Sequence, residues 1–170
     1  SSIKLDEKTQ INTCNVPLIN APEWIGVDRA LGAWGAYKKA KKSGTMNPNG
    51  LIVIDAGTVL SITHIKQNGE FTGGQLVAGF NLQLTAMANG TKNLFIPESR
   101  VIPENQFPSK TSDAMLKGSI QALLGIILET QRKENITIWL CGGDSILILD
   151  QLKNHKIKVF HHPNLVLEGM

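Results

Sequence analysis

The hydrophobic positions along the chain follow two patterns, short unbroken apolar runs and longer stretches with helical spacing. The short runs are rich in β-branched residues and are bounded by Gly, Pro and Asn, which favours buried strands. They predict strands at residues 51–55, 60–65, 71–76, 136–140 and 157–160. Between the second and third runs, Asn68-Gly69 is the strongest short signal of a β-hairpin.

Stretches with apolar residues at intervals of three and four predict helices. They cover residues 30–42, 80–88, a long segment from 111, a helix that follows residue 144 and runs through 152, and a helical start at 164–170. Three prolines make residues 90–110 an ordered but irregular crossing. Three strands followed by alternating helices and strands predict an α/β domain with a mixed sheet.

Composition narrows the class of protein. The chain has 170 residues, of which 42% are hydrophobic and 18% charged, as in a globular domain that buries a core. The net charge is +3 and aromatic residues make up 5%, which argues against a nucleic-acid partner. Lys38, Lys39, Lys41 and Lys42 lie in one five-residue stretch, which is either a solvated helix end or an anion contact.

The sequence also bears on the compartment. Cys14 and Cys141 lie far apart and have no metal-ligand spacing. No apolar run reaches the ~20 residues that span a bilayer, and the polar start is unlike a signal peptide. We therefore expect reduced thiols, no membrane partner and a cytoplasmic location.

The segment Asp55-Ala-Gly57-Thr58 is the most informative candidate for chemistry. An acidic residue at the end of a buried strand faces the sheet edge where ligands collect. Gly57 permits a tight turn whose N–H groups can bind a phosphate, and Thr58 adds a hydroxyl donor. The pattern predicts a site for a metal ion and a nucleotide, unless Asp55 merely caps the turn.

Four further segments each have a functional and a purely structural interpretation. In residues 26–29, Asp28 is either functional or the N-cap of the next helix. The glycines of residues 73–79 allow close approach of a ligand or form a bulge. Residues 111–118 offer three capping side chains, and residues 141–144 form either a bare surface for adenine or a plain tight connection.

Together and in this order, the segments resemble the motif series of the type III pantothenate kinases. The series is Gly-x-Asp-Arg, Asp-x-Gly-Thr, Gly-Gly-(x)4-Gly, Thr-x-x-Ala-Met-x-x-Gly and Gly-Gly. The resemblance runs from about Ile25 to the closing Asn164-Leu-Val-Leu-Glu-Gly169. It implies an α/β, ribonuclease H-like/actin-like fold, mainly the C-terminal half of a two-domain kinase. Residues 1–25 would be an extended remnant of the N-terminal domain, and residues 26–170 the kinase domain.

The resemblance also implies a reaction and its partners. Members of the family transfer the γ-phosphoryl group of ATP to pantothenate, giving 4'-phosphopantothenate in the first step of coenzyme A biosynthesis. The implied cofactors are ATP, Mg²⁺ and a monovalent cation, K⁺ or NH₄⁺. A homodimer is implied as well.

Site residues follow from the same resemblance, motif by motif. Asp28 would be the general base, and Asp55 would bind the monovalent cation. The residues expected to bind pantothenate are Gly26, Val27, Arg29 and Thr111, the last from the partner subunit. The residues expected to bind ATP are Gly57, Thr58, Gly142 and Gly143.

The chain departs from the family in three places. The family opens with a strand and an Asp-x-Gly-Asn-Thr turn, which nothing in residues 1–25 matches, Asp6 being the closest acid. Ala78 stands where the family usually has proline, and the chain stops at Met170, where the terminal helix should continue.

Two explanations of these departures stay open. The chain is a piece of a complete kinase, in which case it should expose apolar surface and self-associate. Alternatively, it is a shortened relative that acts as a non-catalytic binding or regulatory protein. A ribonuclease H-like nuclease is disfavoured, since two-metal cleavage needs clustered carboxylates and the strands offer only Asp55.

Overall fold

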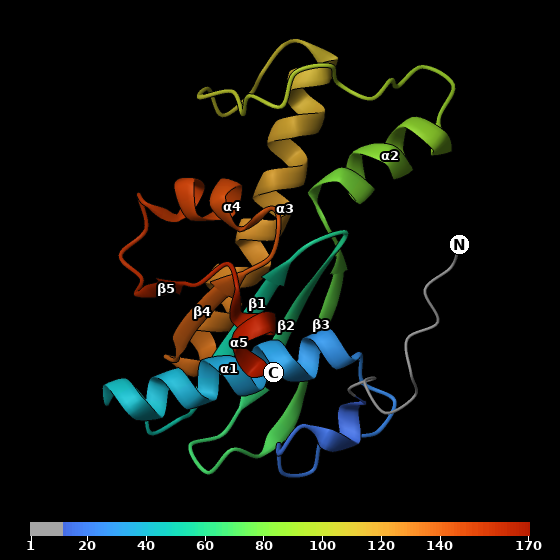
Figure 1. The fold of residues 1–170 in the computed structure, drawn as a ribbon. Coiled ribbons are helices and arrows are strands. Elements are labelled where there is room, and N and C mark those ends of the chain that lie inside the picture. The colour runs from blue at the N-terminus through green and yellow to red at the C-terminus, as the bar shows by residue number, and fades with distance from the viewer. Residues whose placement is uncertain (1–11) are drawn as a thin grey trace, which may run out of the picture.

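The computed structural model describes residues 12–170 (Figure 1), so the first part of the predicted amino-terminal segment lies outside the described residues. The elements in chain order are η2 (Thr13–Asn15), α1 (Val27–Ser43), β1 (Leu51–Ala56), β2 (Val59–Ile65), β3 (Phe71–Ala78), α2 (Phe80–Gly90), α3 (Thr111–Glu134), β4 (Thr137–Cys141), α4 (Ser145–Leu152), β5 (Val159–His161) and α5 (Leu165–Gly169). Each predicted strand and helix is confirmed, as is the irregular crossing before α3.

The helix starts differ from the predicted caps. The N-cap of α1 is Gly26, so Asp28 lies in the first turn, where the positive end of the helix dipole stabilises its charge. The interpretation of Asp28 as the N-cap is therefore wrong. Lys110 is the N-cap of α3 and makes no side-chain capping bond, so none of the three predicted capping side chains holds that position.

The five strands form one mixed sheet in the order β3-β2-β1-β4-β5. β1 pairs antiparallel with β2 and β2 with β3, while β1–β4 and β4–β5 are parallel. The mixed sheet that the element order predicted is thereby confirmed. It brings the carboxyl ends of β1 and β4 to the same edge.

Helices cover both faces of this sheet, as Figure 1 shows. On one face α2, α3 and α4 pack against residues such as Ile52 and Ile54 of β1. On the other face α1 and α5 pack against Val53 of β1 and Trp139 of β4. Strand alternation therefore assigns the odd-numbered positions of β1, Asp55 among them, to the α1 face. Within residues 12–170, no helix is both long and apolar enough for a bilayer crossing.

Two glycines let α5 lie directly on α1. A Cβ added at Gly35 of α1 would overlap the carbonyl oxygen of Leu165, and one added at Gly169 would overlap that of Leu31. Only residues without a side chain permit this backbone contact. The helix that carries Asp28 is thus held from outside by an element that comes late in the chain.

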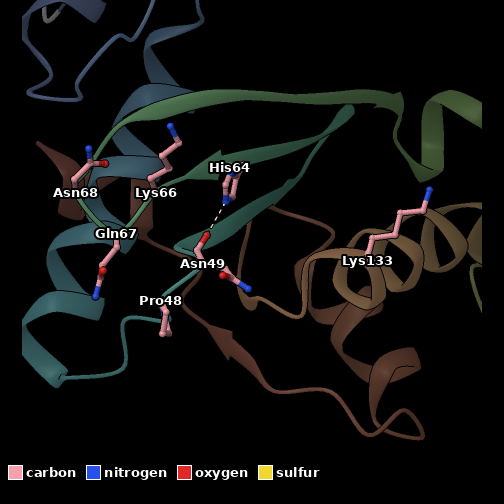
Figure 2. Close-up of a pocket in the computed structure, with 7 residues that line it drawn as sticks. All are labelled: Pro48, Asn49, His64, Lys66, Gln67, Asn68 and Lys133. Carbon is pink, nitrogen blue, oxygen red and sulfur yellow. Dashed lines mark hydrogen bonds between the residues drawn. The ribbon is translucent and has the colours of Figure 1, made fainter.

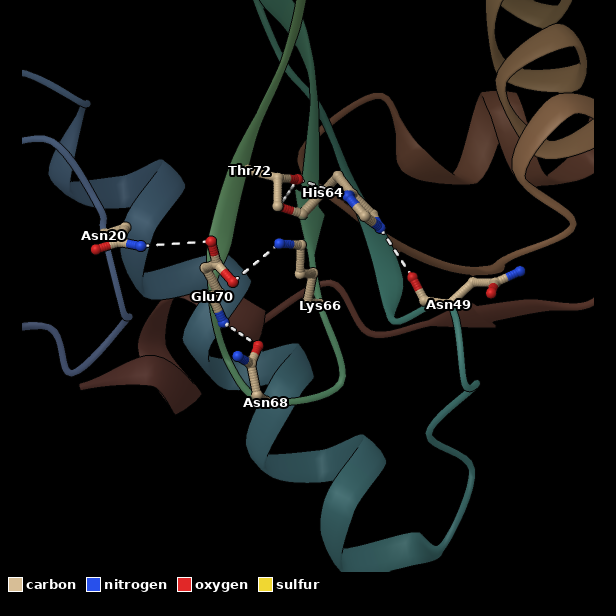
Figure 3. Close-up of polar contacts among 7 residues, drawn as sticks. All are labelled: Asn20, Asn49, His64, Lys66, Asn68, Glu70 and Thr72. Carbon is tan, nitrogen blue, oxygen red and sulfur yellow. Dashed lines mark hydrogen bonds and ion pairs between the residues drawn. The ribbon is translucent and has the colours of Figure 1, made fainter.

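Polar side chains hold the end of the β2–β3 hairpin that lies away from Asp55 (Figure 3). The Nδ1 of His64 lies 2.6 Å from the Thr72 hydroxyl, and its Nε2 donates to the carbonyl of Asn49 at 3.0 Å. Across the turn, the Lys66 ammonium lies 3.0 Å from the carboxylate of Glu70. These contacts tie β1, β2 and β3 together and fix their register.

Candidate active site

The candidate site lies at the carboxyl end of β1, on the α1 face of the sheet. Strand register places Asp55 opposite Ser61 of β2 and Cys141 of β4, and Ser61 opposite Leu76 of β3. These four side chains form one row across the sheet, with the carboxylate between a hydroxyl and a thiol. The predicted position of Asp55 at a ligand-accessible sheet edge fits this row.

Asp28 and Asp55 come close enough for their charges to interact. Burial, and secondarily the negative charge of Asp28, raise the pKa of Asp55. Asp55 is half-buried whereas Asp28 is exposed, so only Asp55 lacks full hydration of its charge. The amino end of α1 and the carboxyl end of β1 therefore form one acidic mouth.

The turn after β4 packs directly on Asp55. Gly142 has a φ of +93°, and a Cβ there would overlap the carboxylate of Asp55 and the backbone of Ala56. The N–H of Asp144 donates to the carbonyl of Ala56 at 2.8 Å. Gly143 is exposed beside this contact. The predicted turns at 55–58 and 142–143 thus meet, and Gly142 is required both for its backbone angle and for space.

The turn Gly57-Thr58 lies at the outer rim of the same mouth. Thr58 is exposed, and its carbonyl accepts the N–H of Gly79 at 2.9 Å. A Cβ at Gly79 would overlap the carbonyls of Gly57 and Thr58. The last glycine of the Gly-Gly-(x)4-Gly motif therefore braces this turn. The first, Gly73, has a φ of +125° and lies where the β2–β3 register shifts between His64 and Ile65, as the bulge that the sequence suggested would require.

Arg29 points across the sheet toward β2 and β3. Its Nε donates to the hydroxyl of Thr63 at 2.6 Å, and an NH2 group donates to the carbonyl of Ile62 at 3.3 Å. Its guanidinium carbon lies 5.6 Å from the centre of the Phe71 ring, and a Cβ at Gly74 would overlap it. Burial lowers the pKa of Arg29, but the group stays charged because arginine starts so high.

The remaining predicted residues divide into two groups. Gly26 is exposed and Val27 half-buried at the start of α1, beside Asp28. Thr111 is exposed at the amino end of α3, which in Figure 1 projects away from α1 and the sheet. Within one chain the fold gathers nine of the ten predicted site residues around the mouth and leaves Thr111 apart.

Sequence reasoning missed several neighbours of the site. Ser61 and Thr63 lie at alternate positions of an apolar strand, which was the signal that one face of β2 is polar. Cys141 is buried, and its burial, together with the charge of Asp55, raises its pKa to about 12. Burial raises the pKa of Asp144 too, against the opposing charge of Arg100 from the irregular crossing.

Among residues 12–170, no group of three His, Cys, Asp or Glu side chains is arranged to hold a metal ion. A cavity of about 560 Å³ lies at the other end of the sheet, lined by Asn49, His64, Lys66 and Lys133 among others (Figure 2). That cavity contains none of the predicted site residues.

The sequence is similar to known kinases. It is 30% identical over 167 residues to the type III pantothenate kinase of Azobacteroides pseudotrichonymphae genomovar. CFP2, an alignment of 92% of this chain and 63% of that protein. With the type III pantothenate kinase of Chromobacterium violaceum it shares 35% identity over 127 residues, 71% of this chain and 51% of that protein. The chain thus spans about half to two thirds of the length of these relatives.

The fold has a relative among solved structures. A Campylobacter jejuni protein assigned to the Baf family of transcriptional activators superposes with a TM-score of 0.69 at 19% identity, covering 96% of this chain and 71% of that one. This likeness concerns the fold alone, an α/β domain whose mixed sheet is flanked by helices. The sequence profile of the type III pantothenate kinases matches residues 6–133. The chain belongs to the type III pantothenate kinase family.

Proposed function

We propose that this chain forms the pantothenate- and nucleotide-binding part of an ATP-dependent pantothenate kinase that makes 4'-phosphopantothenate. The observation that carries the proposal is the meeting of Asp28, Asp55 and the Gly142 turn at one sheet edge. Family membership supports the substrates, ATP and pantothenate. Both are solutes of the cytoplasm, where coenzyme A is made, so a cytoplasmic location is part of the proposal.

Asp28 is the proposed general base. As the pantothenate hydroxyl oxygen attacks the γ-phosphorus, Asp28 accepts its proton, the new P–O bond forms, and the bond to the β-phosphate oxygen breaks, with its electron pair leaving on ADP. The exposed carboxylate of Asp28 is open to a substrate from solvent. Gly26 and Val27 beside it, and the guanidinium of Arg29, are the proposed pantothenate contacts.

The opposite wall of the mouth is the proposed nucleotide site. The turn at Gly57 and Thr58 offers N–H and hydroxyl donors to phosphate, and Gly142 and Gly143 leave bare backbone for adenosine. A monovalent cation suits Asp55. Burial disfavours the charged form of this carboxyl and so raises its pKa, and a bound cation would stabilise the charged form. Bound cations would supply charge neutralisation, and Mg²⁺ would be held largely by the ATP phosphates.

A homodimer is also part of the proposal. Large apolar side chains are exposed on β3 and on the crossing before α3, namely Leu76, Phe95, Val101 and Phe107. Large apolar side chains left exposed in this way favour association with another chain. A second chain seated there would bring its own α3 near the mouth, which would account for the separation of Thr111 from the other site residues.

The test is turnover. The protein is incubated with ATP and pantothenate, and 4'-phosphopantothenate is measured by mass spectrometry. Asp28→Asn should lower the rate about 10²- to 10⁴-fold, the usual contribution of a general base. Asp150→Asn is the matched control, because Asp150 is an exposed aspartate of α4 paired with Lys153. An Asp28→Asn variant that keeps its activity would show that the base is another group.

The alternative is a non-catalytic binding or regulatory relative. Such a protein would bind ligands at the same mouth without transferring a phosphoryl group. Calorimetric titration with ATP and pantothenate, each alone, separates the two functions. Binding of both ligands without product formation would support the alternative.

A further inference from the structure

A second pocket lies on the α1 face, at the carboxyl end of the helix. Its volume is about 420 Å³, and it is lined by Trp139, Phe160 and His162 and by Lys39, Lys42, Ser43 and Thr45. α1 begins at the mouth and extends about 25 Å at 1.5 Å per residue. The pocket shares none of the residues predicted for the candidate active site, although Trp139 in its lining lies on β4 two residues before Cys141, the neighbour of Asp55.

The floor of this pocket is aromatic. The Trp139 ring stacks on Phe160 with centroids 4.8 Å apart and on His162 with centroids 5.2 Å apart. Burial, and then the charge of Lys39, lower the pKa of His162, so its ring is neutral at pH 7. Volumes of 300–1,000 Å³ with aromatic lining are typical of sites for small molecules with flat rings.

One buried polar atom of Trp139 has no partner. The indole Nε1 of Trp139 makes no hydrogen bond within the described part of the chain, and Trp139 is 2% exposed. Buried donors without an acceptor are rare, because each costs about 1–3 kcal/mol. Because this atom is closed to solvent in the structure, an acceptor on a bound molecule would remove the cost only if the Trp139 ring turned to expose Nε1.

The rim of the pocket carries positive charge. Lys42 has no acidic partner among residues 12–170, whereas Lys39 lies 3.1 Å from the carboxylate of Glu168. The negative end of α1 is already satisfied, since the carbonyl of Lys39 accepts the Ser43 hydroxyl and that of Ala40 accepts the N–H of Thr45. The charge left unpaired at the rim is therefore that of Lys42.

From these contacts we propose that the pocket binds a small molecule that combines a flat aromatic ring with an anionic group. The ring lies against the half-buried side chains of Phe160 and His162, above the buried Trp139, and the anion lies at Lys42. The sequence left two interpretations of the lysine stretch, a solvated helix end or an anion contact. The proposal assigns the anion contact to Lys42 alone. The other three are engaged elsewhere: Lys39 with Glu168, Lys38 over Trp34 and Lys41 over Tyr37.

The test is a titration with 1-naphthyl phosphate followed by the indole N–H signals in ¹H–¹⁵N NMR spectra. The chain has three tryptophans, so each signal can be assigned with a Trp→Phe variant. A saturable shift of the Trp139 signal alone is expected. Lys42→Ala should weaken binding about tenfold, the effect of losing one charged contact. Lys38→Ala, an exposed lysine on the same helix, is the matched control and should bind normally.

Two further probes separate the ring from the anion. Inorganic phosphate alone and 1-naphthalenemethanol alone should each bind about tenfold more weakly than 1-naphthyl phosphate or worse. The proposal is overturned if the shift does not saturate, if Lys42→Ala and Lys38→Ala behave alike, or if phosphate alone binds as well. The active-site proposal is unaffected by any of these outcomes, because turnover is measured separately.

Discussion

The contact between Arg29 and Thr63 is the sharpest test of how α1 is fixed to the sheet. Arg29 follows the proposed base by one residue, and its Nε donates to the Thr63 hydroxyl at 2.6 Å. Thr63 is 1% exposed, so water cannot replace the guanidinium there. We consider three variants, Arg29→Ala, Thr63→Val and the double variant.

The structure sets the size of each effect. Arg29→Ala loses a hydrogen bond from a charged donor, worth about 1.5–3 kcal/mol, and leaves the buried Thr63 hydroxyl unpaired. It also loses the contact with the Phe71 ring, worth about 0.5–1 kcal/mol. A destabilisation of about 2–4 kcal/mol is expected in total. Thr63→Val keeps the shape and lets the half-buried Arg29 turn toward water, so about 1 kcal/mol is expected.

The assay is urea unfolding of the three variants beside the wild type, with equal m-values as the check that two-state behaviour holds. The double variant should be no less stable than Arg29→Ala, which gives a coupling free energy of about 1 kcal/mol. Effects that add to within about 0.5 kcal/mol would refute the bond between the two side chains. Arg29→Lys should recover little, because an ammonium cannot reproduce the planar arrangement of donors.

Three further predictions test other contacts of the fold. Because burial and Asp28 raise the pKa of Asp55, the wild type loses stability as pH rises through that pKa. Asp55→Asn should therefore raise Tm at pH 7 but not below about pH 4, and equal gains at both pH values would contradict this. Gly169→Ala should lower the free energy of unfolding by about 1–3 kcal/mol, because the new methyl group would force α5 off α1. Gly125→Ala is the matched control: a methyl group there meets open space and should raise the free energy of unfolding by about 0.5–1 kcal/mol. Both values are measured by chemical unfolding. A thiol reagent should label the exposed Cys14 at pH 8 and reach Cys141 only on unfolding, because Cys141 is buried and its pKa is about 12. Rapid labelling of both cysteines in the folded protein would contradict the burial of Cys141.

Much of the fold was predictable because each strand carried its own signal. The apolar run 51–55, for example, needs burial on both faces, and the only ready solution is a central strand. Register was not predictable, because a slip of one residue exchanges the two faces of a strand. That is why Asp55 was found at a strand end while its neighbours Ser61 and Cys141 were missed.

Arg29 illustrates a second limit. The sequence placed it beside Asp28, but its reach to Thr63 depends on the space left by Gly74 on another strand. Thr111 illustrates a third, since a motif orders residues along the chain and not in space. The helix that begins at Thr111 carries it away from the mouth.

The seating of α5 on α1 has a consequence for synthesis. α1 leaves the ribosome before α5, which follows it by the five strands and three other helices of the described chain. Until α5 emerges, the surface around Gly35 has no partner and the first turn of α1 lacks its outer support. Contacts so distant in sequence form slowly. We therefore expect nascent chains halted before residue 165 to hold Asp28 loosely, and ligand binding to develop only once α5 has emerged.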